Sequence, residues 1–187
     1  GSGFHVHFSL NDSRGNNLFA SPVNALNSMM RLCIAGQLAL MPASVAILAP
    51  GVNAFRRLRK NLTEPVFNSW GYNTRSAALR IPCSDESNRR IEYRLAGADA
   101  NPYLVAATIL TGMLYGLEHI DEGDLPEPQH DQPELPLFQQ EAIEAFARCQ
   151  YLTDSLGDAF SEQWVACKLS ELDWFERIVT QEESHLA

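Results

Sequence analysis

The chain has 187 residues, of which 45% are hydrophobic and 9% aromatic, and its formal net charge is −9. This composition excludes wholesale disorder and a general coat for nucleic acid, and the length suits one domain or one large part of a domain. Because the apolar runs stop well short of the roughly 20 residues that span a bilayer, we expect a cytoplasmic protein that binds neither membranes nor nucleic acid.

The charge differs between the two halves of the chain. Residues 1–100 contain 11 basic and 6 acidic residues, whereas residues 101–187 contain 3 basic and 17 acidic residues, so the halves carry +5 and −14. The excess of arginine between Arg56 and Arg94 predicts a site for phosphate or carboxylate groups in the first half. The acidic half is expected to be a solvated surface.

The four cysteines stand at wide spacings without a CxxC pair. They are Cys33, Cys83, Cys149 and Cys167. All four lie in segments with an apolar character, which favours reduced core residues over disulfides or a zinc site.

Alternating apolar and polar residues occupy positions 4–10, which predicts a strand with one face buried and one face open. His5, His7 and Ser9 share the open face. A dense cluster of turn-forming residues follows Leu10 and ends the strand.

Ser21 and Pro22 are typical of a helix start, and the apolar residues that follow recur at helical spacing as far as about Leu40. Prolines and a glycine between positions 42 and 51 indicate a second, shorter apolar segment. The polar, basic residues 56–63 predict a loop.

Two more strands are predicted at residues 77–82 and 90–95, because apolar and polar residues alternate again. Arg80 lies in the first of them. One face of the second carries Arg90, Glu92 and Arg94.

The last third of the chain is predicted to be mainly helical. Residues 99–102 cap a helix from about Tyr103 to Leu117, which is apolar almost all round and is expected to be buried. Residues 121–136 hold four prolines among acidic residues and predict a loop without regular structure. Residues 138–156 and 158–180 then predict a helical hairpin joined around Gly157.

Two histidines at positions i and i+2 of a strand point the same way, and imidazole nitrogen is a preferred ligand of divalent metals. The pair of His5 and His7 is weak evidence by itself, because most such pairs only form hydrogen bonds at a sheet surface. Glu92 strengthens it, since a carboxylate between Arg90 and Arg94 suits a metal beside a bound polyphosphate. The cationic set is extended by Arg57, Arg75 and Arg80. The pattern suggests a metal and nucleotide site with carboxylate recognition.

Five segments resemble, in the same order, motifs of the glutamine synthetase family. They are residues 1–10, 49–58, 73–82, 89–94 and 98–104. The helical end of the chain also resembles the tail of that family. The resemblance implies an α+β fold, namely the C-terminal part of a glutamine synthetase-like catalytic domain, with antiparallel strands lining an active-site funnel, helices packed outside and a C-terminal helical hairpin. It divides the chain into a partial catalytic region at 1–120, an acidic proline-rich loop at 121–136 and the hairpin at 137–187 of the same domain.

The resemblance also implies an ATP-dependent ligase that uses Mg²⁺ or Mn²⁺. Enzymes of this family phosphorylate the γ-carboxylate of glutamate with ATP, and an amine or ammonia then displaces the phosphate. Matched position by position, the metal would be held by His5 and Glu92, and the carboxylates of glutamate by Arg57 and Arg94. ATP would be contacted by His7, Ser9, Arg80 and Arg90. Arg75 would neutralise the γ-phosphoryl group during transfer, which is the help that phosphoryl transfer most needs.

One departure from the family concerns the flap that follows the Arg57 motif. Glutamine synthetases place a glutamate there that helps to deprotonate ammonium, whereas this chain has Thr63 at that position and Glu64 one residue later. Either Glu64 takes the catalytic role after a shift of one residue, or the nucleophile is not ammonia. Residues 70–73 and 94–99 resemble the γ-glutamylpolyamine synthetases more closely, so a polyamine is the preferred acceptor and ammonia the alternative.

A second departure is that the other acidic metal ligands of the family precede the motif with which this chain begins. We therefore expect a C-terminal part that does not turn over alone, from a protein that self-associates into a large homo-oligomer. A catalytically silent member with a structural or regulatory role is a further alternative, although His5, Glu92 and the matched arginines are retained. A metal-dependent amidohydrolase would need more histidines at strand ends, and His119, His130 and His185 lie in acidic or tail segments.

Overall fold

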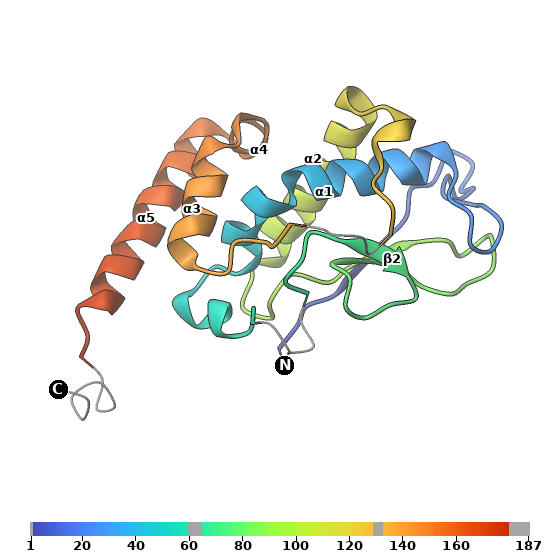
Figure 1. Cartoon of the computed structure of the whole chain (residues 1–187). Helices are drawn as coiled ribbons and strands as arrows, with labels where there is room; N and C mark the ends of the chain where they lie inside the picture. Colours follow the sequence, from blue (N-terminus) through green and yellow to red (C-terminus); the bar gives the residue numbers. More distant parts are fainter. Residues whose placement is uncertain (1, 60–64, 129–132, 180–187) are drawn as a thin grey trace.

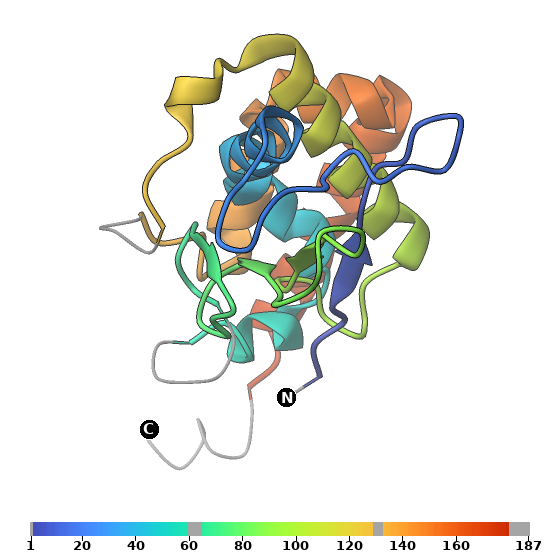
Figure 2. The same cartoon turned by 90° about the vertical axis from the view of Figure 1, so that its right-hand side faces the viewer.

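The computed structural model describes residues 2–59, 65–128 and 133–179. A small sheet lies beneath the long helix α1 (Ser28–Leu48), which packs against α2 (Pro102–His119). Helices α3 (Gln139–Arg148) and α5 (Asp158–Glu176) pack side by side at the end of the molecule away from strand β2 (Figures 1 and 2). This arrangement is the predicted α+β fold with helices outside the sheet.

The sheet has four strands in the order β1-β4-β3-β2. They are β1 (Val6–Phe8), β2 (Trp70–Tyr72), β3 (Leu79–Ile81) and β4 (Ile91–Tyr93). The three predicted strands form antiparallel pairs, as expected, and the strand that was not predicted, β2, pairs parallel with β3 and makes the sheet mixed. Asn73 follows β2 with a φ of 47°. This left-handed conformation turns the chain directly after β2, and the six residues between β2 and β3 form the connection that two parallel strands require.

Helix α1 begins later than predicted. The expected start at Ser21 and Pro22 is wrong, because Asn27 caps the first turn and its Oδ1 accepts a hydrogen bond of 2.9 Å from the Met30 N–H. Asn24 has a φ of 61°, and this left-handed conformation interrupts any helix that starts at Pro22.

Helix α1 also continues past Pro42, so the break predicted there is wrong. Proline has no N–H to donate to the carbonyl four residues earlier, which belongs to Leu38. The side chain of Asn68 supplies a donor instead, because its Nδ2 lies 2.9 Å from the Leu38 oxygen. A tertiary contact thus allows one helix where the sequence indicates two segments.

The continuous α1 is, by length and composition, apolar enough to cross a membrane, whereas no apolar run was expected to be long enough. In this fold 78% of its most apolar window is buried inside the protein. A buried core helix meets the same criterion, so α1 is weak evidence for a membrane span.

Helices α1 and α2 approach each other at glycines. A Cβ atom added to Gly36 would overlap the backbone of Gly112 and Gly116, and one added to Gly116 would overlap the carbonyl of Leu32. The two backbones come this close only because no side chain separates them.

Helix α2 is capped by Asn101, whose Oδ1 accepts from the Tyr103 N–H at 2.9 Å. The prediction that this helix is buried all round is wrong, since only one of its faces packs against α1. Leu110 and Leu114 remain 61% and 48% exposed on the described part of the protein.

The predicted helical hairpin is confirmed, with one difference. Cys149 interrupts the first helix and separates α3 from the short α4 (Gln150–Leu156). Gly157 joins α4 to α5 with a φ of 93°, a conformation that glycine adopts without strain. The two predicted loops each contain part of a 3₁₀ helix, η1 (Val52–Arg56) at the start of the basic segment and η2 (Glu122–Asp124) in the acidic one.

All four cysteines are free, as predicted, but they are not all core residues. Cys33 is buried in α1 and Cys149 is half-buried, whereas Cys83 and Cys167 are exposed. Their apolar sequence neighbours suggested burial, but Cys83 lies in a loop and Cys167 on the outer side of α5.

Candidate active site

Three strands each contribute one polar residue to a row across the sheet. The strand register pairs His7 of β1 with Glu92 of β4, and Glu92 with Arg80 of β3. Residues directly opposite each other on antiparallel strands point to the same face. The common face expected from the alternation is therefore present, and the opposite face carries Ile91 and Tyr93 into the hydrophobic core.

The Glu92 carboxylate lies between two guanidinium groups. Nη1 of Arg80 donates to Oε2 at 2.8 Å, and Nη1 of Arg94 donates to Oε1 at 3.0 Å. Glu92 is only 3% exposed and Arg94 only 5%. A carboxylate this deeply buried needs such partners, because burying an unpaired charge is strongly unfavourable.

The two arginines also determine the charge state of Glu92. Burial by itself raises the pKa of the carboxyl, but the hydrogen bond from Arg80 and the charges of Arg94 and Arg80 act in the other direction, with a smaller contribution from His7. The net result is a pKa below the ordinary value, so the carboxylate is ionised at neutral pH.

Both histidines of β1 face the same carboxylate. Nδ1 of His5 lies 3.3 Å from Oε1 of Glu92, and Nε2 of His7 lies 3.9 Å from it. Arg90 reaches this group from the side, because its Nε donates to Nδ1 of His7 at 3.3 Å. The group of His5, His7, Arg80, Arg94 and Glu92, with Arg90 beside it, is called the Glu92 cluster below.

The spacing of the cluster fits two neighbouring ligands of one divalent ion. Ligands about 2.1 Å from an octahedral Mg²⁺ and at right angles to each other lie about 3.0 Å apart, close to the 3.3 Å between Nδ1 of His5 and Oε1 of Glu92. No group of three His, Cys, Asp or Glu side chains that could hold an ion occurs within residues 2–59, 65–128 and 133–179. The metal role of His5 and Glu92 therefore stays a prediction that this spacing permits.

Arg57 approaches the end of β4 from a different segment. It follows η1, and its Nη2 donates to the Leu95 carbonyl at 2.8 Å. Because Leu95 is the residue after Arg94, the two arginines predicted to bind the carboxylates of glutamate lie at the same end of β4. Sequence motifs about 40 residues apart are thus brought together by the fold.

Ser9 and Arg90 line a polar cavity of about 680 Å³ next to the Glu92 cluster. The cavity also contacts Asn17, whose Nδ2 donates to the carbonyl of Arg89 at 2.7 Å and so holds the start of β4 against the first loop. Its volume lies in the range of small-molecule sites. Two of the four residues predicted to contact nucleotide thus share one open space.

For different reasons, the structure does not place the remaining two predicted residues, Arg75 and Glu64, in the cluster. Arg75 is exposed in the loop between β2 and β3, and no hydrogen bond or ion pair holds it to any other described residue. Glu64, with Thr63 beside it, lies outside the described residues. Their predicted roles stay predictions.

Sequence reasoning missed the part played by Asn73. Its Oδ1 accepts a hydrogen bond of 2.7 Å from Nη2 of Arg80, so it orients the guanidinium group whose Nη1 binds Glu92. An asparagine directly after an aromatic strand segment is a signal for a left-handed turn, but the contact with Arg80 depends on the pairing of β2 with β3.

Comparison with known proteins identifies the family of the chain. Residues 1–186 match the family described as glutamine synthetase, catalytic domain. The chain is 41% identical, over 98% of its length, to the gamma-glutamylputrescine synthetase PuuA of Escherichia coli, and 32% identical, over 98%, to the gamma-glutamylethanolamide synthetase GlnA4 of Streptomyces coelicolor. It spans 40% of the length of each of these two relatives.

The fold is similar to a solved structure described as a GmaS/ADP complex, with a TM-score of 0.87 and 27% sequence identity. That similarity covers 100% of this chain and 46% of the other. The family match over nearly all residues, the identity to the synthetases and the shared fold all lead to one conclusion: this chain belongs to the glutamine synthetase family and forms part of its catalytic domain.

Proposed function

We propose that the protein containing this chain is an ATP-dependent ligase that joins the γ-carboxylate of glutamate to an amine. ATP transfers its γ-phosphoryl group to the carboxylate, and the amine then attacks the γ-glutamyl phosphate and releases inorganic phosphate. The Glu92 cluster carries this proposal. It combines a buried, ionised carboxylate, two histidines and three arginines, which are groups that bind a metal and phosphates.

Each residue of the cluster has a proposed task. His5 and Glu92 would hold Mg²⁺ or Mn²⁺, which would neutralise the charge of the ATP phosphates when bound. Arg80 and Arg90 would bind phosphate oxygens, and the polar cavity beside them would admit the rest of the nucleotide along His7 and Ser9. These arginines are held in place before ATP arrives, and such preorganised charge stabilises a transition state best.

Arg57 and Arg94 are the proposed sites for the carboxylates of glutamate. Both guanidinium groups lie at the end of β4, and planar guanidinium groups bind carboxylates with two parallel hydrogen bonds. Arg75 would act only while the phosphoryl group transfers. Its exposed position in the described structure agrees with a group that reaches the site from a loop.

A polyamine is the proposed acceptor. A glutamine synthetase must take a proton from ammonium, so it needs a carboxylate at the flap. The sequence has Thr63 at that position, and a threonine side chain is smaller than that of glutamate. A diamine can be held by its second ammonium group at another point. The similarity to gamma-glutamylputrescine synthetase supports this choice. A cytoplasmic location and a large homo-oligomer belong to the same proposal.

The test is a screen of acceptors with the full-length protein, ATP, Mg²⁺ and glutamate, in which phosphate release is measured. Putrescine, ethanolamine and ammonia are compared at equal concentrations. We expect putrescine to give the highest kcat/KM, and Glu64→Ala to lower it by less than about tenfold, which is about 1.4 kcal/mol of transition-state stabilisation. Glu86→Ala, which removes an exposed carboxylate, is the matched control.

Two results would contradict the proposal in different ways. Efficient glutamine formation from ammonia that Glu64→Ala abolishes would establish the ammonia-dependent alternative and place Glu64 at the flap position. Absence of phosphate release with every acceptor, in a protein that still assembles, would establish the catalytically silent alternative.

A further inference from the structure

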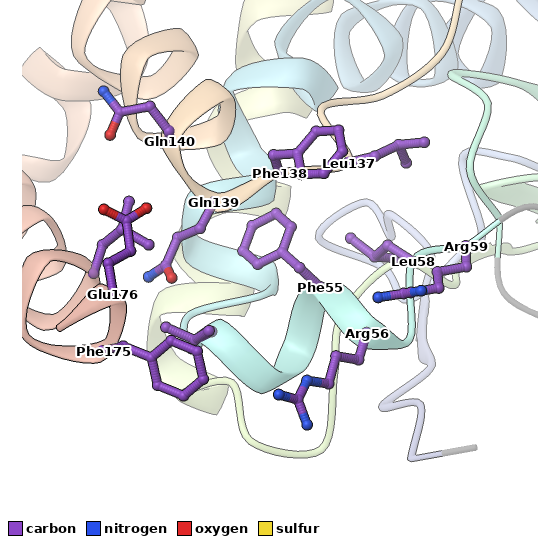
Figure 3. Close-up of a pocket in the computed structure, with 12 residues that line it drawn as sticks. Phe55, Arg56, Leu58, Arg59, Leu137, Phe138, Gln139, Gln140, Phe175 and Glu176 are labelled. Atoms are coloured by element: carbon purple, nitrogen blue, oxygen red, sulfur yellow. The ribbon is translucent and has the colours of Figure 1, made fainter. Parts of the chain in front are cut away.

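A second pocket is lined by none of the residues of the Glu92 cluster. It has a volume of about 520 Å³ and is lined by η1, the residues that lead into α3 and the end of α5 (Figure 3). Most of the lining is apolar and is contributed by Phe55, Leu58, Leu137, Phe138, Leu172 and Phe175. Both the volume and the apolar lining with few polar groups are typical of small-molecule sites.

One polar side chain in this pocket has no partner. Gln139 is 6% exposed, and neither its Oε1 nor its Nε2 forms a hydrogen bond within the described structure. Figure 3 shows the Gln139 side chain among the residues that line the pocket, with its amide directed toward Phe175 and Glu176 of α5. Buried amides are almost always hydrogen-bonded, so a donor and an acceptor aimed into an apolar pocket indicate a ligand that offers both.

The mouth of the pocket carries net positive charge. Arg56 and Arg59 line it with exposed side chains, and neither has an ion-pair partner among the described residues. Glu176 is the one acidic residue in the described lining. A ligand that extends from Gln139 to the mouth would therefore be favoured if it carries an anionic group there.

We propose that this pocket binds a small amphipathic carboxylate that combines an aromatic ring, an amide and an anionic end. The ring would pack among the three phenylalanines, where aromatic contacts are favourable. The amide would accept from Nε2 of Gln139 and donate to its Oε1, and the carboxylate would lie near Arg56 and Arg59. None of these contacts uses a residue of the Glu92 cluster, so the binding proposal does not depend on the proposed function.

The pocket is placed to act on the proposed active site. Phe55 and Arg56 belong to the single turn η1, and the next residue, Arg57, is bonded to the Leu95 carbonyl at the end of β4. A ligand seated against η1 would restrict the segment that positions Arg57. This consequence, unlike the binding itself, rests on the proposed function.

The test uses N-acetyl-L-phenylalanine, which carries a ring, an amide and a carboxylate, with the full-length protein and titration calorimetry. We expect saturable binding that weakens about tenfold in Gln139→Leu, because the buried hydrogen bonds to the ligand are lost. N-acetyl-L-phenylalaninamide, which lacks the carboxylate, should bind several-fold more weakly, and N-acetylglycine, which lacks the ring, should show no binding. Gln150→Leu changes an exposed glutamine on α4 whose amide already bonds Asp154, and it should leave binding unchanged.

Thermal unfolding separates a ligand role of Gln139 from a structural one. Because the amide has no partner to lose, Gln139→Leu should keep or raise the Tm. A marked fall in the Tm of Gln139→Leu, or equal affinity of that variant for the probe, would overturn the proposal. Binding that occurs only after removal of residues 180–187 would also overturn it, since the chain itself would then be the occupant. The glutamate KM measured with the probe tests the link to Arg57 separately.

Discussion

The buried carboxylate of Glu92 contacts two guanidinium groups and lies near two imidazoles. The opposing effects of burial and of these neighbours on its pKa decide whether it is charged. Burial alone would favour the protonated acid. Arg80 and Arg94 reverse this preference, so the residue keeps a negative charge that can attract a cation. The same pairing makes Glu92 structurally important, because both arginines would lose their shared partner without it.

We predict that Glu92→Ala lowers the free energy of unfolding by about 3 kcal/mol, the range measured when one partner of a buried pair is removed. Urea unfolding at pH 7 measures the change. Glu86→Ala removes an exposed carboxylate six residues earlier in the chain and should stay within about 0.5 kcal/mol of the parent. A loss below about 1 kcal/mol for Glu92→Ala would mean that water replaces the carboxylate around Arg80 and Arg94.

Cys33 provides a prediction that depends on pH. Its burial in α1 raises the pKa of the thiol to about 12, above the ordinary value of 9.0. Because the thiolate is the reactive form, iodoacetamide at pH 8 should label exposed Cys83 and Cys167 in the folded chain and label Cys33 only after unfolding. Peptide mass spectrometry after timed labelling measures this order, and rapid labelling of Cys33 in the folded chain would contradict its burial.

The sign of the linked stability change follows from the same shift. The unfolded chain loses the Cys33 proton near the ordinary pKa, whereas the folded chain keeps it up to about 12. The unfolded state therefore binds fewer protons in this window, and the contribution of Cys33 to the free energy of unfolding falls as pH rises above about 9.

Among the elements, α1 depends most on contacts from elsewhere in the chain. Its interior proline leaves the Leu38 carbonyl without its usual donor, and Asn68 supplies one from a loop that precedes β2. Pro42 and Asn68 are separated by 26 positions in the sequence, yet the length of α1 depends on both.

A double-mutant cycle tests this dependence. Asn68→Ala should destabilise the protein by about 1 to 2 kcal/mol, because it leaves the buried Leu38 carbonyl unsatisfied. In a Pro42→Ala background the new N–H at position 42 can bond that carbonyl, so Asn68→Ala should then cost less than about 0.5 kcal/mol. Chemical unfolding of the four proteins gives the coupling energy. Equal losses in both backgrounds would show that Asn68 acts through some other contact.

The contact between α1 and α2 has a different basis, the absence of side chains. We predict that Gly36→Ala destabilises the protein by about 3 kcal/mol, because the added methyl group overlaps the backbone of α2 and the helices must move apart. Differential scanning calorimetry should show a fall in Tm of roughly 6 to 12 °C for a chain of this size. Gly123→Ala is the control, since its added Cβ meets no atom within 4 Å. An unchanged Tm in Gly36→Ala would contradict the close helix contact.

At the scale of the whole molecule, the chain carries the Glu92 cluster on one face of its sheet. The strands place His7, Arg80 and Glu92 on one face, and within the described residues no group of three His, Cys, Asp or Glu side chains could hold a metal ion. Exposed leucines along α2 leave an apolar face without cover in the described structure. Both features agree with a piece that works within a larger protein.

We predict that the isolated chain of 187 residues releases phosphate from ATP, glutamate and amine at less than about one thousandth of the full-length rate. An incomplete ligand set would not hold the metal in place for phosphoryl transfer. Far-ultraviolet circular dichroism of the same sample shows whether the chain is folded, which separates a missing ligand from a missing fold. A folded chain with a rate within tenfold of the full-length enzyme would mean that His5 and Glu92 suffice.

The sequence alone determined the common face of the Glu92 cluster, the hairpin around Gly157 and the family. Period-two alternation places His5 and His7 on one side of a strand whatever surrounds it, and glycine permits the turn at Gly157 without help from neighbours. These properties are local. The family motifs could be identified for the same reason, because each one is a continuous run of residues.

Only the tertiary structure decided where α1 starts and ends, how β2 joins the sheet and which carboxylate oxygen each arginine binds. Pro42 predicts a helix break and Ser21 a helix start. However, Asn68 replaces the hydrogen bond that Pro42 cannot form, and the left-handed conformation of Asn24 interrupts the helix before Asn27. The unpaired amide of Gln139 could not be foreseen either. The end of α1, the pairing of β2 and the partners of the arginines depend on contacts between segments distant in sequence, and a local pattern contains no information about the partner that a fold brings to it.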